Sequence, residues 1–304
     1  MISVIMSTYN EPLSYIILSI KSILEQSYKD IEFIIVVDNP EYSSLIGILN
    51  DYSKTDSRIK VLINDKNLGL TSSLNEALEF ASGQYIARMD ADDISNTERL
   101  KKQLLFLENN RLDLVGSNIQ NIDENGIESS CISFFPETVK QVEKYALYDS
   151  PVPHPTWLAK RKVYDSLGGY REIDACEDYD FLVRAILQGF KIGNVQEPLL
   201  NYRINSKGIS ATRKTKQKLA LAILRENYKI GKETTEQEIF EYIDSNRGRK
   251  KARELDEYYR KTAKLKGMKD NKIKAFFYKV LIFATCKEGR QILINLLNER
   301  VILR

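Results

Sequence analysis

The sequence contains few of the residues that mark a disulfide-bonded, zinc-thiolate or membrane-spanning protein. Its 304 residues include three cysteines and one histidine. Three scattered cysteines are too few, and odd in number, for a disulfide framework or a zinc site, which fits a reducing cytosol. No apolar run approaches the roughly 18 residues that a membrane span needs. The first ten residues lack the basic segment of a signal peptide, so we expect none.

The composition is that of a globular protein, but the charges are unevenly distributed. Apolar residues make up 43% of the chain and charged residues 29%. Residues 1–206 have a net charge of −10 and residues 207–304 a net charge of +13, which together give the overall +3. This asymmetry predicts two parts with different roles. We place the boundary near residue 210, between an acidic domain at 1–210 and a basic region at 211–304.

Short apolar segments alternate with helical patterns over the first hundred residues. The apolar segments lie at 3–7, 31–37, 59–63 and 85–89, and the helical patterns between them at 13–26, 43–52 and 71–81. Continuous apolar strands separated by helices of this length predict a parallel sheet covered on both faces. With right-handed crossovers the fold class is an open, doubly wound α/β sheet.

The pattern then changes from strict alternation to mixed α+β. We expect helices at 96–109, 136–148 and 177–187, strands at 112–122, 127–135 and 156–160, and a turn at 123–126. Pro198 is expected to separate two short β stretches before Asn205.

From residue 212 onward the pattern is helical and amphipathic, with lysine and arginine on the outer faces. The expected helices are 216–230, 236–246, 250–266, 272–285 and 290–297. A helical bundle with a solvated basic surface is favoured for the early helices. Attachment to a membrane surface is favoured for residues 271–304, where aromatic and apolar residues alternate with lysines. Nucleic-acid binding is disfavoured, because no recognition motif is present and the core is acidic.

Ligands of an open parallel sheet bind beyond the carboxyl ends of its strands. Polar and acidic residues follow all four predicted strands: Thr8 to Glu11, Asp38, Asn64 to Leu68, and Asp90 to Asp93. No Gly-rich phosphate loop follows the first strand, which disfavours a nicotinamide or ATP-hydrolysing enzyme. A mononucleotide whose phosphates are neutralised by a metal ion remains possible at this edge.

Two acidic clusters are the candidates for metal binding and catalysis. In an extended segment Asp90 and Asp92 face the same side, and hard oxygen ligands beside a diphosphate suit Mg²⁺ or Mn²⁺. Helix capping is the alternative, and we assign Asp93 to it. Glu177 and Asp178 begin a predicted helix, and one of them is a candidate general base if the fold carries it to the nucleotide edge.

Other residues near these clusters have structural interpretations. Asp180 is expected to act only as a helix cap. His154, the only histidine, lies in a proline-rich loop and is expected to be structural rather than catalytic. Trp157 is expected in the core or in a pocket wall.

The order of these motifs resembles the family 2 glycosyltransferases, which have the nucleotide-sugar-binding GT-A fold. The resemblance covers about residues 1–210 and excludes the C-terminal helices. It rests on Ser7-Thr8-Tyr9-Asn10, Val36-Val37-Asp38, Asn67-Leu68-Gly69-Leu70 with Asn75, Asp90-Ala91-Asp92, Glu177-Asp178-Tyr179-Asp180 and Tyr202-Arg203.

The resemblance implies roles for residues of the donor site. The nucleoside pocket would be lined by Thr8, Tyr9, Asn10 and Glu11. Asp38 would contact the base, commonly uracil, with thymine as the alternative because Asn39-Pro40 replaces the family's Gly-Ser. The nucleotide would also be approached by Lys66, Asn67 and Gly69. Tyr202 and Arg203 would lie in a segment that closes over the donor.

The resemblance also implies the metal ligands and the catalytic residues. Asp92 would bind the cation that bridges the diphosphate, and Asp90 would contact the ribose or the metal. Asn205 stands where the family often has a histidine near the metal, and its carbonyl oxygen would be a third ligand. Asp178 would be the catalytic base, with Glu177 beside it orienting the acceptor.

The sequence therefore predicts an inverting, Mn²⁺- or Mg²⁺-dependent glycosyltransferase that uses a nucleoside-diphosphate sugar, UDP-linked by expectation. The expected acceptor is a saccharide or lipid-linked glycan in bacterial surface or capsular polysaccharide synthesis. The expected location is the cytoplasm, at the inner face of the cell membrane. The alternative is a catalytically silent nucleotide-binding scaffold. A sugar nucleotidylyltransferase is disfavoured, because no Gly-rich, Arg-containing loop follows the first strand.

Overall fold

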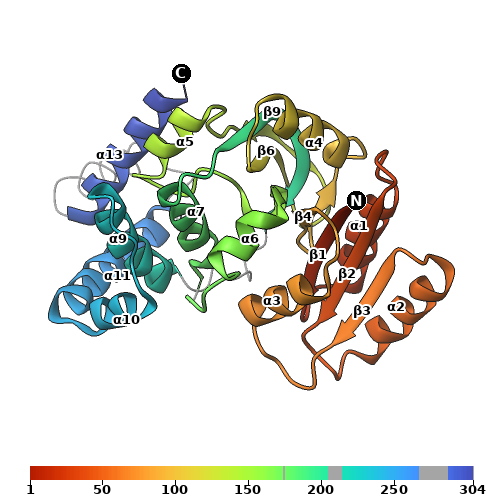
Figure 1. The fold of residues 1–304 in the computed structure, drawn as a ribbon. Coiled ribbons are helices and arrows are strands. Elements are labelled where there is room, and N and C mark those ends of the chain that lie inside the picture. The colour runs from red at the N-terminus through yellow and green to blue at the C-terminus, as the bar shows by residue number, and fades with distance from the viewer. Residues whose placement is uncertain (174, 205–213, 267–286, 304) are drawn as a thin grey trace.

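The computed structural model describes residues 1–173, 175–204, 214–266 and 287–303 (Figure 1). The described chain contains a nine-stranded mixed sheet of order β3-β2-β1-β4-β8-β6-β9-β5, with β7 paired to β6. The first four strands are parallel: β1 (Ile2–Thr8), β2 (Ile31–Val37), β3 (Ile59–Ile63) and β4 (Tyr85–Arg88). Helices α1 (Leu13–Leu24), α2 (Ser43–Thr55) and α3 (Leu70–Phe80) connect them. The predicted α/β fold class is confirmed.

Alternate residues of the central strands belong to two separate apolar layers. Val4 and Met6 of β1 pack in one layer with α1, α2 and α4 (Arg99–Asn109). Ile5, between them, packs in the other layer with α3, α6 (Arg161–Leu167) and α7 (Glu177–Leu187). Because both faces of the sheet are buried, these strands are apolar along their whole length.

The second half of the sheet mixes strand directions. β8 (Leu158–Lys160) runs antiparallel to both β4 and β6 (Leu114–Ile122), and β6 runs parallel to β9 (Ile192–Arg203). The other elements here are β5 (Ile94–Ser95), β7 (Glu128–Ser133), α5 (Val139–Tyr145) and the 3₁₀ turn η1 (His154–Thr156). The predicted turn at 123–126 is present, with Asp123 accepting hydrogen bonds from the amides of Asn125 and Ile127.

One sequence-based expectation for this region was wrong, and two short elements were missed. Pro198 does not separate two strands, because β9 continues through it with a shift of register opposite Asn118. An irregular register removes the amide hydrogen bond that proline cannot supply, so the strand continues. The short helix α6 and the two-residue strand β5 were not predicted, because they are too short to show a period.

The C-terminal helices pack beside α7 and α5, on the side of the molecule away from β3 (Figure 1). They are α9 (Lys214–Lys229), α10 (Glu236–Asp244), α11 (Asn246–Lys266) and α13 (Lys287–Ile302). Leu221 and Leu224 of α9 are buried against Tyr179 and Val183 of α7. The helical bundle favoured for the early helices therefore packs directly against the core.

Part of the C-terminal prediction lies outside the described residues. The helix expected at 272–285 and its aromatic residues fall there, as does Asn205. Among the described helices, none is both long and apolar enough to cross a membrane.

Candidate active site at the carboxyl edge of the sheet

The end of β1 forms a compact polar turn. The Glu11 carboxylate accepts hydrogen bonds from the Thr8 hydroxyl and the Tyr9 amide, each at 2.8 Å. Thr8 is buried, whereas Tyr9 and Asn10 are exposed at the edge of the sheet. Asn10 accepts a hydrogen bond from the Asn39 side chain at 2.8 Å, which joins the ends of β1 and β2. Tyr9, Asn10 and Glu11 are therefore accessible at this edge, and the buried Thr8 holds Glu11 from beneath.

Asp38, at the end of β2, holds the loop that follows β3. Its carboxylate accepts hydrogen bonds from the Asn64 side chain at 2.7 Å and from the amides of Leu68 and Gly69 at 2.7 and 2.9 Å. Gly69 has φ +88°, a conformation that favours glycine and that begins α3. Lys66 and Asn67 are exposed on this loop. Asp38 is itself buried, so its contact with a base stays a prediction.

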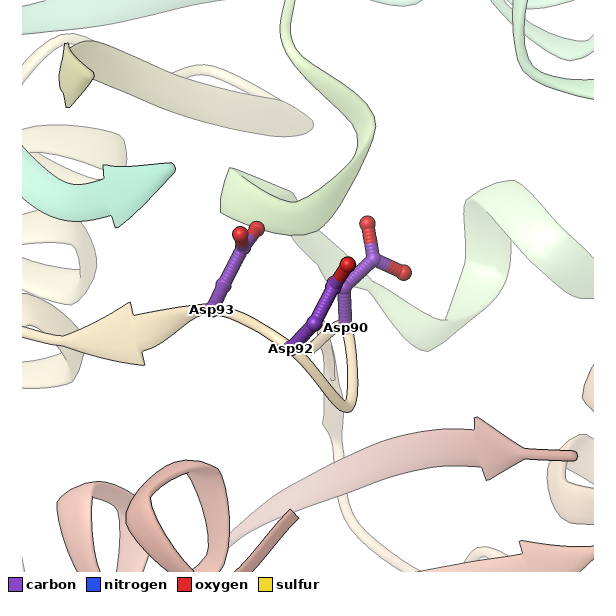
Figure 2. Close-up of side chains that lie close together, drawn as sticks. All are labelled: Asp90, Asp92 and Asp93. Carbon is purple, nitrogen blue, oxygen red and sulfur yellow. The ribbon is translucent and has the colours of Figure 1, made fainter. Parts of the chain in front are cut away.

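Three carboxylates converge where β4 turns into β5. Ligand atoms of Asp90, Asp92 and Asp93 lie within 4.8 Å of one another. Figure 2 shows the three side chains on the same side of this turn. The convergence arises differently from the expected extended segment, because Ala91 and Asp92 form a turn. That turn also brings in Asp93, which we had assigned to helix capping.

Crowding and burial disfavour the charged forms of these acids. Burial, followed by the charges of Asp90 and Glu11, raises the pKa of Asp92 to about 7. Burial and the charges of Asp90 and Asp92 raise the pKa of Asp93 well above its usual value. One oxygen of Asp93 accepts from the Arg203 amide at 2.8 Å, and the other is buried without a hydrogen-bond partner in the described chain. A bound cation would favour the charged forms of these crowded acids and would give the unused Asp93 oxygen a partner.

Two buried arginines beneath this turn were missed by the sequence analysis. Arg88, the last residue of β4, donates a hydrogen bond to the Met89 carbonyl and forms an ion pair with the Asp90 carboxylate. Arg99 donates to the carbonyls of Pro155 and Arg88 at 2.7 and 3.1 Å. For Arg88 the sequence held a signal, because an arginine inside an apolar strand segment is rarely buried without a partner. Arg99 begins α4 and gave no such signal.

Arg203, the last residue of β9, contacts the acidic turn. Its guanidinium donates to the carbonyls of Asp92 at 2.8 Å and Asp123 at 2.9 Å, and it lies 4.1 Å from the centre of the Tyr15 ring. Because these contacts occupy a side chain that is 3% exposed, the structure gives Arg203 a role in holding the site together. A contact with the donor stays a prediction, as it does for Tyr202, whose pKa is raised by burial and by Asp93, Asp90 and Asp92.

The second acidic cluster lies within reach of the charge of the first. Glu177 and Asp178 begin α7, and the charge of Asp90 contributes to raising the pKa of both carboxyls. Burial and the neighbouring Asp178 raise the pKa of Glu177 to about 8. Burial also raises the pKa of Asp178 to about 6, although a 2.7 Å hydrogen bond from the Tyr179 amide favours its charged form. The fold therefore carries Asp178 to the side of the molecule that holds Asp90.

Asp180 and His154 serve the structure beneath this cluster. Asp180 pairs with Arg184 at 2.8 Å in the interior, so its partner is an arginine and not the helix terminus we expected. His154 Nε2 lies 2.9 Å from the Tyr170 hydroxyl, and its ring packs on Trp157. The core position of Trp157 is confirmed. The contacts of His154 agree with a structural role, which stays a prediction. The Asn75 side chain donates a hydrogen bond to the Tyr170 carbonyl and accepts one from the Tyr170 amide, each at 2.9 Å.

Comparison with known proteins agrees with this geometry. Residues 3–167 match the family described as glycosyl transferase family 2. An uncharacterised glycosyltransferase of Methanocaldococcus jannaschii is 40% identical over 72% of this chain and 76% of its own. The Escherichia coli O-antigen biosynthesis glycosyltransferase WbnJ is 34% identical over 68% of this chain and 81% of its own.

Similarity also extends to a solved structure. The crystal structure of S. aureus TarS 1-349 in complex with UDP-GlcNAc has a TM-score of 0.60 and 19% identity. The match covers 80% of this chain and 70% of that one. At this identity the likeness concerns the fold, which is the GT-A arrangement that the sequence motifs predicted.

Proposed function

The chain belongs to glycosyl transferase family 2, and from this premise we propose that it is an inverting, metal-dependent transferase using a nucleoside-diphosphate sugar. The proposal is supported by the carboxylate cluster of Asp90, Asp92 and Asp93 after β4 and by the effect of the Asp90 charge on the pKa of both Glu177 and Asp178. A metal site and a base site on one edge are what single-displacement glycosyl transfer requires.

Asp90 and Asp92 are the proposed ligands for Mn²⁺ or Mg²⁺, with Asp93 behind them. Carboxylate oxygens are the ligands that these ions prefer. When bound, the cation would neutralise charge on the leaving nucleoside diphosphate. Arg88 holds the Asp90 carboxylate from below, so the ligand is oriented before any donor arrives. Asn205 would complete the shell, as its position in the motif suggests.

Asp178 is the proposed base that removes the proton of the acceptor hydroxyl as that oxygen attacks the anomeric carbon. With a pKa of about 6 the Asp178 carboxyl is charged at neutral pH. Its pKa is also close enough to the working pH for it to accept a proton readily. Glu177, with a pKa of about 8, is protonated at neutral pH and can donate a hydrogen bond that orients the acceptor. Attack from the face opposite the leaving group inverts the anomeric centre in one step.

The donor and acceptor classes are carried over from relatives. The proposed donor is UDP-linked, supported by the UDP-GlcNAc bound to the structurally similar TarS and by the predicted base contact of Asp38. The proposed donor pocket lies at Thr8, Tyr9, Asn10 and Glu11 together with Lys66, Asn67 and Gly69. The proposed acceptor is a saccharide or lipid-linked glycan in surface polysaccharide synthesis, supported by the O-antigen role in the name of WbnJ.

We also propose that the enzyme works at the cytoplasmic face of the membrane, with residues 271–304 making the contact. The support is the net charge of +13 over residues 207–304 and the aromatic and lysine pattern of that segment. Flotation with anionic liposomes tests this. If the full chain and a chain ending at residue 270 remain equally unbound, the membrane proposal fails.

The central proposal is tested by measuring nucleotide release from a panel of UDP-, dTDP- and GDP-sugars, with and without Mn²⁺. We expect Mn²⁺-dependent UDP release by the wild type and a loss of about 10²- to 10⁴-fold in Asp178→Asn, because general-base catalysis contributes that much. Donor binding, measured by thermal shift, should persist in this variant. A silent scaffold would bind a nucleotide but release none from any donor.

A further inference from the structure

We infer that a cleft in the C-terminal helical region is a binding site for a phosphate-bearing ligand. The cleft has a volume of about 530 Å³ and is lined by residues of α9, α10, α11, α13 and the segment after α5. This volume lies within the range of small-ligand sites, roughly 300–1,000 Å³. It is separate from the carboxyl edge of the sheet, and the predicted catalytic residues do not line it.

The charge of the cleft selects an anion. Five basic side chains line it, against two acidic ones, Glu226 and Glu254. The five are Arg225, Lys229, Arg247, Lys250 and Lys251. Glu226 is already paired with Arg247 at 2.7 Å, which leaves the excess positive charge uncompensated. Cations gathered around a hollow reinforce one another's potential, whereas cations on a convex helix face diverge into solvent.

Two lysines in the cleft are available to a ligand. Lys229 of α9 and Lys250 of α11 are exposed and make no ion pair within the described part of the chain. Arg225, which also lines the cleft, is anchored by a hydrogen bond that its guanidinium donates to the Tyr148 carbonyl. Anchored guanidinium and mobile ammonium groups are the side chains that bind phosphate oxygens in proteins.

The segment lining one wall of this cleft also contacts the helix that carries the predicted base. Leu147 and Tyr148 line the cleft, and the preceding Ala146 carbonyl accepts a hydrogen bond from the Tyr179 hydroxyl of α7. The next residue, Asp149, pairs with Lys218 at 3.2 Å, and its charge reaches Asp178. Residues 146–149 therefore connect a ligand in the cleft with the start of α7, where the predicted base Asp178 lies.

From this position we infer that the phosphate group belongs to the acceptor substrate and not to the donor. The assignment rests on the proposed function, but the anion site itself does not. A diphosphate carried on an apolar chain and a phosphate on a soluble glycan share the same recognition chemistry. The experiment separates the two sources by using inorganic pyrophosphate and farnesyl diphosphate as probes.

The test compares two double variants with the same change of charge on the same two helices. Lys229→Glu/Lys250→Glu alters the cleft, and Lys214→Glu/Lys264→Glu alters exposed lysines of α9 and α11 that do not line it. Calorimetric titration with each probe in EDTA measures binding without the metal site. We expect affinity for pyrophosphate to fall at least about tenfold in the cleft variant, the loss of one charge-assisted contact. The control should bind like the wild type.

The outcomes distinguish this inference from the proposed function. Equal pyrophosphate binding by the wild type and the cleft variant overturns the anion site, whatever the enzyme's activity. Displacement of pyrophosphate by a short oligonucleotide at lower concentration would assign the cleft to nucleic acid and also overturn it. Tighter binding of farnesyl diphosphate than of pyrophosphate supports a lipid-borne phosphate, and equal binding of the two supports a soluble one. Metal-dependent UDP release without acceptor should be the same in the cleft variant as in the wild type. If the wild type and both variants release no UDP, the proposed function is refuted, but the anion site is not.

Discussion

Asp92 shows how the surroundings of one residue set its chemistry. An aspartate in solution is charged above pH about 4, but here burial and the charges of Asp90 and Glu11 raise its pKa to about 7. Asp93, Glu177 and Asp178 are raised for related reasons. The folded chain therefore binds more protons than the unfolded chain between pH about 4 and 8.

The first prediction concerns the stability of this site. In EDTA the free energy of unfolding should fall as the pH rises from about 4 to 8, because the folded state must lose protons that the unfolded state has already lost. Mn²⁺ should restore stability, and its effect should grow over the same range as protons leave its ligands. Thermal unfolding at several pH values, with EDTA or Mn²⁺, measures both trends.

Asp92→Asn is the matched variant for this experiment. We expect its affinity for Mn²⁺ to fall at least about tenfold, which removes about 1.4 kcal/mol of the stabilisation by saturating metal. In EDTA at pH 8 it should be no less stable than the wild type, because one of the crowded charges is gone. An undiminished Mn²⁺ effect in this variant would contradict the ligand assignment.

The second prediction concerns Asp178 as a base. The rate of UDP release with acceptor should rise with pH around or below 6, as Asp178 loses its proton, because a bound cation lowers the pKa of a nearby carboxyl. Asp178→Asn should lose this limb together with about 10²- to 10⁴-fold of the rate. A pH profile of kcat/KM checks this, and an unchanged limb in a residually active Asp178→Asn would assign the base elsewhere.

Helix α7 is the element that brings catalysis to the site. It begins after Ala175, which has a positive φ of 61°, so the chain turns sharply before Glu177. Its interior is fixed by the buried pair between Asp180 and Arg184, and Arg184 also donates to the carbonyls of Leu167 and Gly169. The pair therefore ties the helix to the preceding segment.

The third prediction removes one partner of this pair. Asp180→Ala leaves Arg184 buried without its counter-charge and should reduce the free energy of unfolding by about 3–5 kcal/mol. The exposed pair between Asp51 and Lys54 provides the control, and Asp51→Ala should change stability by less than about 1 kcal/mol. Urea unfolding of both variants is the measurement. Similar losses in the two would show that burial of the pair has no special importance.

At the scale of the whole molecule, the boundary placed near residue 210 has a physical consequence. The C-terminal helices bury Ile173, Cys176, Tyr179 and Val183, all from the catalytic part of the chain. A separate helical domain would leave this apolar surface uncovered. We therefore propose that the two parts fold as one cooperative unit, despite their opposite net charges.

The fourth prediction tests this cooperation. Leu224→Ala in α9 should reduce the free energy of unfolding by about 2–5 kcal/mol, because Leu224 is buried. Trp157, the single tryptophan, lies in the core of the catalytic part and reports its unfolding by fluorescence. We expect the Trp157 transition to shift by the full amount, whereas Ile230→Ala, at a position 74% exposed, should not shift it. An unshifted Trp157 transition in Leu224→Ala would show two independent domains.

The sequence by itself determined the local features of this protein. Strand and helix periods predicted β1 to β4 and the helices between them, and the order of polar residues after each strand placed Asp38 and Asp90 to Asp92 at one edge. The family motifs within residues 1–210 identified the fold. These features depend on neighbours within a few positions along the chain, so a periodic pattern is enough to reveal them.

Only the tertiary structure decided which distant groups meet. Asp178 comes near Asp90 because β8 and β6 extend the sheet beyond β4 and bring α7 back over it. The same return places Arg203 on the acidic turn, where its amide donates to Asp93, and forms the basic cleft beside Tyr148. Such contacts join residues that are far apart in the sequence, and they depend on the strand order and on which charged groups become buried together. A local periodic pattern of the sequence carries no information on either.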